Sequence, residues 1–159
     1  MMAIDSLDHK ILIALQKDAS LSYQEIAERL RTSTATVHNR IKRLSKEGVL
    51  SLPKANVAVE KLGYNLFAFI GVSLKEASKM DLVSRKLLAI PEILEIYFTT
   101  GEFSLMCKLV ARETSELYDI LVKKIQNIGD IQSTYTYVVL ESLLQRDLSL
   151  DKVQIEIKE

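Results

Sequence analysis

The sequence predicts an α+β protein, in which an N-terminal three-helix helix-turn-helix domain is joined by an extended linker to a ferredoxin-like βαββαβ domain. Two observations support this. Apolar residues recur at helical spacing as far as Gly48, and after Gly63 stretches of strand-like alternation take turns with stretches of helical spacing. We therefore divide the 159 residues into a helix-turn-helix domain over 1–50, a linker over 51–62, a sheet domain over 63–144 and a C-terminal tail over 145–159.

Three short amphipathic helices are expected in the first fifty residues. The first runs from about residue 6 to residue 17. The second covers residues 23–30 and follows Ser22, a helix-capping residue type, with Glu25 three positions later. A short connection leads to the third, and two short helices joined in this way form a helix-turn-helix unit.

The third helix has one apolar face and one basic face. It begins after two cap residue types, Ser33 and Thr34. The apolar positions recur at i, i+4 and i+7. They are Val37, Ile41 and Leu44. Residues 29–46 hold six Lys or Arg and no Asp or Glu, an excess that suits a polyphosphate surface. Ordinary solvated helices also carry basic faces, so charge and periodicity leave both interpretations open.

The run from Asp5 to Leu50 resembles the N-terminal domain of the Lrp/AsnC, or feast/famine, transcription regulators. The shared features are a Leu-Asp pair before an apolar helix, the pattern S-x-x-T-V-x-x-R-I-x-x-L in the third helix, and a Gly-Val-Leu exit. The turn departs from the family, because Arg31 and Thr32 stand where a Gly and an apolar residue are usual. A positive φ costs a non-Gly residue energy, so we expect a differently shaped turn or a slightly displaced helix start.

The resemblance implies a sequence-specific regulator whose recognition helix enters the major groove of double-stranded DNA. The outward-facing residues of its first turns are the candidates for reading base edges. They are Thr34, Ala35, His38 and Asn39. Asn39 can make a bidentate contact with adenine. The candidates for phosphate contacts are Ser33, Thr36, Arg40, Lys42 and Arg43.

The sheet domain is expected to contain four strands, over residues 65–74, 93–100, 103–111 and 131–140, and two helices, over residues 77–89 and 115–128. The strands are apolar on both faces, but two helices cover only one face of a sheet. The other face is left as an apolar patch. It includes Phe67, Phe69, Tyr135 and Tyr137. We therefore expect a homodimer formed through sheet faces; the alternative is a monomer whose C-terminal tail folds over the sheet.

This half resembles the ligand-sensing domain of the same family, through the Thr-Gly-Glu-Phe hairpin and the spaced threonines of the last strand. In the family an amino acid binds between dimers and biases assembly into octamers or larger rings. The matching candidates for effector binding are Thr100, Gly101, Glu102, Ser104, Thr134 and Thr136. Ser104 departs from the family, which usually has an acid there. Strand propensity also favours threonine, and hairpin turns favour glycine, without any ligand.

An enzyme is the main alternative from another class, because tetrapyrrole decarboxylases combine the same two modules. The only histidines, His9 and His38, both lie in the N-terminal domain, which leaves none in the sheet domain for such chemistry. We expect no metal site, cofactor or catalytic residue, since neither zinc-type spacing nor a phosphate-binding glycine loop is present. A third alternative is an amino-acid sensor that no longer binds DNA, which the basic third helix argues against.

Bulk properties indicate a globular protein of the cytosol. The net charge is zero, yet residues 1–50 hold 8 Lys or Arg against 6 Asp or Glu, whereas residues 51–159 hold 13 against 15. The single Cys107 excludes an intrachain disulfide and alternates with leucines, so we expect it in the core. No apolar run reaches the roughly 20 residues that span a bilayer, and the N-terminus lacks the pattern of a signal peptide.

Overall fold

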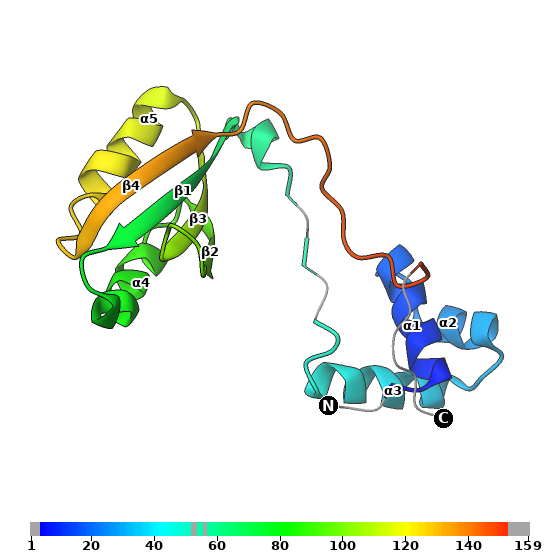
Figure 1. Ribbon diagram of the computed structural model, residues 1–159. Helices are drawn as coiled ribbons and strands as arrows, with labels where there is room; N and C mark the ends of the chain where they lie inside the picture. The colour runs from blue at the N-terminus through cyan, green and yellow to red at the C-terminus, as the bar shows by residue number, and fades with distance from the viewer. Residues whose placement is uncertain (1–3, 52–53, 56, 153–159) are drawn as a thin grey trace. The chain divides into compact units, whose positions relative to one another are not determined.

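The computed structural model describes residues 4–51, 54–55 and 57–152 (Figure 1). The chain divides into two compact units, one made by the N-terminal residues up to 56 together with the chain from 145 onward, the other by residues 57–144. The first unit is helical and the second is a four-stranded antiparallel sheet with helices, which confirms the predicted α+β class. Within the described ranges, no helix is long and apolar enough to cross a membrane.

The helical unit contains α1 (Ser6–Lys17), α2 (Tyr23–Leu30) and α3 (Thr34–Lys46). Its core joins fully buried side chains from all three helices. They are Ile11, Ile26 and Val37. Capping boxes start α1 and α2, because a side chain at each N-cap accepts from a backbone N–H three residues later and the later side chain accepts in return. The box at Ser22 matches the sequence pattern, whereas the one at Asp5 was not predicted.

The C-terminal segment belongs to the helical unit, not to the sheet unit that the alternative of a covered sheet requires. The side-chain amide of Gln16 forms two hydrogen bonds with the backbone of this segment. Nε2 donates to Leu148 O at 2.6 Å, and Oε1 accepts from Leu150 N at 3.0 Å. Lys17 pairs with Asp151 at 2.9 Å. The chain therefore returns to α1 after completing the sheet. Residues 153–159 of the predicted tail, and Pro53 of the predicted linker, lie outside the described residues.

The sheet contains β1 (Leu66–Leu74), β2 (Ile93–Phe98), β3 (Leu105–Ala111) and β4 (Ile131–Val138). Its order is β2-β3-β1-β4 and every pairing is antiparallel, as a βαββαβ chain requires. A short 3₁₀-helix (Val59–Leu62) precedes the sheet. The connection between β2 and β3 is longer than predicted, because pairing stops at Phe98 and the Thr99 N–H to Ser104 O bond, at 3.2 Å, closes a six-residue loop.

Two helical segments cover one face of the sheet (Figure 1). A 3₁₀ turn (Ala77–Lys79) leads into α4 (Met80–Leu88), and α5 (Thr114–Asp119) continues as a π-helix (Ile120–Ile125). The second helical stretch thus ends three residues before the predicted residue 128. Alternate strand residues pack beneath these helices, among them the fully buried Ile70 and Cys107. Burial raises the pKa of the Cys107 thiol to about 11, so this cysteine packs and does not react at neutral pH.

The opposite face of the sheet is aromatic and open to solvent. Phe69, Tyr97, Tyr135 and Tyr137 are each between 37% and 53% exposed. Phe103 folds back over this face, where its ring lies 5.3 Å from the Tyr135 ring, measured between centroids. A Cβ at Gly71 would come within 2.5 Å of the Phe103 ring, so the glycine leaves the space in which that ring packs.

We predict that Gly71→Ala lowers the free energy of unfolding by about 1–3 kcal/mol, the usual cost of inserting a methyl group into packed surroundings. Gly101→Ala is the matched control, because a Cβ there meets nothing within 4 Å. Its effect should stay within about 0.5 kcal/mol. Urea denaturation of the full chain measures both. Equal effects of the two substitutions would show that Phe103 does not depend on Gly71.

Candidate nucleic-acid interface

The turn between α2 and α3 keeps a tight shape despite its arginine. Arg31 adopts the left-handed conformation, with φ of 53°, and Thr32 N–H donates to Ala27 O at 3.0 Å. The helix then starts at Thr34, directly after the cap predicted for it. The expected energetic cost is therefore borne by Arg31 itself, and the start of α3 is not displaced.

The outward face of α3 presents a row of polar or small side chains followed by lysines. Thr34, Ala35, His38 and Asn39 are all exposed, and so are Lys42 and Lys46 beyond them. Among the described residues, neither lysine has a carboxylate partner. The His38 ring leans on the Tyr23 ring of α2, with centroids 5.6 Å apart. Sequence reasoning did not select Tyr23, which extends this exposed surface onto α2.

Ser33 and Thr36 are occupied at the start of the helix. Ser33 Oγ accepts from the Thr36 backbone N–H at 3.1 Å and lies 2.7 Å from Thr36 Oγ1. Ser33 is exposed and Thr36 is half-buried. Both hydroxyls therefore stabilise the N-terminus of α3, where free backbone N–H groups and the helix dipole also favour an anion.

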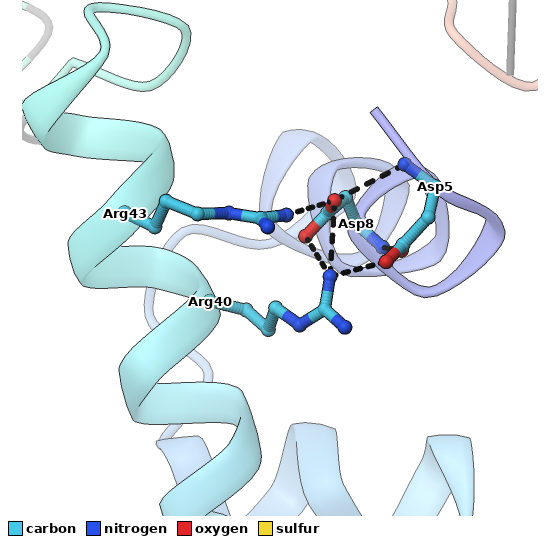
Figure 2. A network of polar contacts seen from close by, with 4 residues as sticks. All are labelled: Asp5, Asp8, Arg40 and Arg43. Carbon is cyan, nitrogen blue, oxygen red and sulfur yellow. Dashed lines mark hydrogen bonds and ion pairs between the residues drawn. The ribbon is translucent and has the colours of Figure 1, made fainter. Parts of the chain in front are cut away.

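Arg40 and Arg43 point from α3 to acids at the start of α1 (Figure 2). Arg40 Nη1 pairs with the Asp5 carboxylate and lies 3.3 Å from both oxygens of Asp8. Arg43 Nη2 pairs with Asp8 as well. The Asp8 side chain is completely buried, with 0% exposure, whereas 28% of the Arg40 side chain and 43% of the Arg43 side chain remain exposed. Two of the six basic residues of this region are thus bound within the protein.

The pKa values of two groups in the network, Asp5 and Arg40, are shifted in the direction that favours their charged forms. The backbone N–H of Asp8 holds the pKa of Asp5 below its ordinary value, and Arg40 adds to this lowering against the opposing effect of burial. The hydrogen bond with Asp5 raises the pKa of Arg40 in turn. Because the pKa of Asp5 is lower in the folded state than its ordinary value of 3.8, the Asp5 carboxylate stabilises the folded state above pH 3.8. This contribution is lost as the pH falls from 3.8 through the lowered folded-state pKa.

The effector candidates fall into two groups within the sheet unit. Thr100, Gly101 and Glu102 are exposed in the loop between β2 and β3, followed by the half-buried Ser104. Thr134 and Thr136 lie on β4, and β1 separates that edge strand from β3. The Thr134 hydroxyl accepts from Gln126 Nε2 at 3.0 Å. Gly101 has neither a positive φ nor a close neighbour, so the hairpin itself does not require glycine there.

No metal-type cluster occurs in the part of the chain that the structure describes. His9 and His38 both serve other contacts. His9 Nε2 lies 3.0 Å from the Leu150 carbonyl of the returning C-terminal segment, and His38 packs on Tyr23.

Both units of the chain match known protein domains. Residues 4–62 match a winged helix-turn-helix DNA-binding domain, and residues 67–148 match the Lrp/AsnC ligand binding domain. The regulatory protein AsnC of Haemophilus influenzae is 39% identical over 145 residues, which cover 91% of this chain and 97% of the relative. The chain belongs to the Lrp/AsnC family.

Solved structures agree. The structure of E. coli AsnC matches with a TM-score of 0.89 and 35% identity, over 93% of this chain and 99% of that one. A Neisseria meningitidis transcriptional regulator, solved as a complex with L-Met, shares the fold with a TM-score of 0.83 and 24% identity, over 90% and 94% of the two chains.

This Lrp/AsnC family member is a DNA-binding transcriptional regulator and not an enzyme, because its relatives are regulatory proteins and its N-terminal module is a DNA-binding one. The decarboxylase alternative is accordingly set aside. The matched winged helix-turn-helix domain extends through residue 62, past the 1–50 range that we predicted for the helix-turn-helix domain.

We predict that Arg31→Gly raises the free energy of unfolding by about 1 kcal/mol, because glycine adopts the left-handed conformation without the strain of a side chain. Arg29→Gly removes the same charge within α2 and should lower this free energy by about 0.5–1 kcal/mol. Thermal denaturation of the two variants beside the parent measures the difference. Destabilisation by both substitutions would contradict the strain assigned to Arg31.

Proposed function

We propose that this Lrp/AsnC family member reads a specific DNA sequence with the outward face of α3, and that a small effector such as an amino acid modulates it through its oligomeric state. The observation that carries the first part is the exposed row of Thr34, Ala35, His38 and Asn39 at the N-terminal end of α3, the end of a helix that favours phosphate. It is followed by Lys42 and Lys46, which have no acidic partner within the described part of the chain. A regulator of this kind acts in the cytoplasm, where its DNA lies.

The roles along α3 follow from what each side chain already contacts. Thr34, Ala35, His38 and Asn39 have exposed side chains and are assigned to base edges. Lys42 is assigned to a phosphate, together with the helix start at Ser33 and Thr36. Arg40 and Arg43 keep part of their surface exposed, but their guanidinium groups already hold Asp5 and Asp8.

We predict that Asn39→Ala relaxes sequence preference at one or two base pairs, at a cost of about 1–3 kcal/mol in specific binding. Lys42→Ala should instead weaken binding to all sequences alike and reduce the salt slope by about one unit. Fluorescence anisotropy with the upstream DNA of the protein's own gene and a scrambled duplex of equal length, at two salt concentrations, measures both. Identical behaviour of the two variants on both duplexes would refute this division of roles.

A homodimer explains the open face of the sheet. Four aromatic side chains on one face remain substantially exposed in the single chain, and burying them is favourable. A two-fold pair would carry two recognition helices, which suits two half-sites about one helical turn apart. We propose that dimers joined through these faces assemble further, to an octamer or a similar ring.

The effector is proposed to bind between dimers, at the β2–β3 loop of one and β4 of another. Backbone N–H groups and threonine hydroxyls suit a carboxylate, and the exposed Glu102 suits an ammonium group. The hairpin itself does not require glycine at position 101. We propose that Gly101 instead lets the effector approach the backbone closely, because glycine has no side chain. A regulator of the same fold holds L-Met, which supports an amino acid as the ligand class. Ser104 in place of an acid suits a different member of that class.

We predict that at least one of the common amino acids changes the sedimentation coefficient of the protein. Glu102→Gln should raise the concentration needed for this change at least tenfold, since a charge-assisted hydrogen bond to an ammonium contributes about 1.5–3 kcal/mol. Glu76→Gln, at another exposed acid before the 3₁₀ turn, is the control. No change in mass with any amino acid would exclude effector-driven assembly.

A further inference from the structure

The acids at the start of α1 do more than cap that helix. Asp5 Oδ1 accepts from Asp8 N–H at 2.9 Å, and Asp8 Oδ2 accepts from Asp5 N–H at 3.1 Å, which completes the capping box. The same two carboxylates also form ion pairs with both arginines of α3, Arg40 and Arg43 (Figure 2). The capping box alone does not need these guanidinium groups, so the ion pairs call for a separate explanation.

We propose that Asp5 and Asp8 hold Arg40 and Arg43 back from phosphate binding and thereby limit the sequence-independent affinity of the protein for DNA. This inference rests on the DNA binding proposed above. It concerns which cations of the basic region reach phosphates, a property that the charge count of the sequence does not show.

Exchange of these partners for phosphates is unfavourable. Asp8 is completely buried, and an arginine that left it for DNA would leave a buried carboxylate with less compensation. A planar guanidinium binds carboxylate and phosphate with the same donors, so each pair formed with an aspartate removes donors from the phosphates. Lys42 and Lys46 have no such competitor among the described residues.

The consequence is a weaker sequence-independent part of DNA binding. Non-specific affinity depends on the number of phosphates that the protein neutralises, whereas base contacts add to the specific complex alone. Two restrained arginines therefore weaken binding to random DNA without removing any base contact. They also keep α3 fixed against α1, so the base-reading row stays in one orientation.

Asp5→Asn in the full-length protein is the first test. Asparagine is as good a cap as aspartate, and the Asp5 side chain is 40% exposed, so α1 keeps its start. Loss of the Asp5 charge loosens Arg40, which then keeps only Asp8 as its partner. The salt slope on a scrambled duplex should steepen by up to about 0.9 and affinity for it should rise up to about fivefold at 0.1 M salt, with a similar rise on the specific duplex. Asp18→Asn, which removes an equal charge from an exposed acid at the end of α1, is the matched control and should leave the slope unchanged.

Variants of Arg40 distinguish restraint of this arginine from a simple loss of negative charge at Asp5. In an Arg40→Gln background, Asp5→Asn should no longer alter the slope, because the cation that it releases is absent. Arg43→Gln alone should change the slope less than Lys42→Gln does. An unchanged slope in Asp5→Asn, or an equal steepening with and without Arg40, would overturn the inference.

The two proposals fail in different ways. If the parent protein binds neither duplex, the DNA-binding function itself is refuted. If the parent binds and Asp5→Asn behaves like Asp18→Asn, only the restraint is refuted. Circular dichroism confirms that each variant is folded, and Asp5→Ser, another cap residue type, replaces Asp5→Asn if that variant does not fold.

Discussion

The buried carboxylate of Asp8 is the constraint on which the DNA-binding unit depends. It completes the capping box at the start of α1 and also forms ion pairs with both arginines of α3, Arg40 and Arg43. The two helices therefore share one network of charges. Removing one partner of a buried ion pair typically costs about 3–5 kcal/mol, because an uncompensated charge stays behind. The position of α3 against α1 is therefore set by electrostatics as well as by the apolar contacts among Ile11, Ile26 and Val37.

The sheet unit follows a different constraint, in which one face is complete and the other is not. The helices bury the residues around Ile70 and Leu109, while the opposite face keeps its aromatic side chains exposed. The Phe103 ring partly covers that face from within the chain, in the space that Gly71 leaves open. The proposed dimer would cover this apolar surface, and the proposed effector would act on that association.

Some of this was readable from the sequence because it is local. The bounds of α1 and α2 agree with the predicted ones, since capping residues and an i, i+3, i+4 periodicity act within a few positions. The βαββαβ order was readable for the same reason. Strand ends were less accurate: β2 stops at Phe98 and not at residue 100, because pairing depends on where β3 lies.

In the candidate interface, too, local features could be predicted and long-range ones could not. The exposed row from Thr34 to Asn39 follows from helical geometry, and the sequence alone predicted that it faces outward. The partners of Arg40 and Arg43 could not be predicted in this way, because Asp5 and Asp8 lie more than thirty positions earlier. A count of the charges in residues 29–46 gives six cations and no acid. The return of Leu148–Leu150 to α1 could not be predicted either, because it depends on hydrogen bonds between the Gln16 side chain and a backbone more than 130 residues away. Sequence thus determined which elements form and which faces they expose; tertiary structure decided which charges remain available, because ion pairing depends on distance in space and not on distance along the chain.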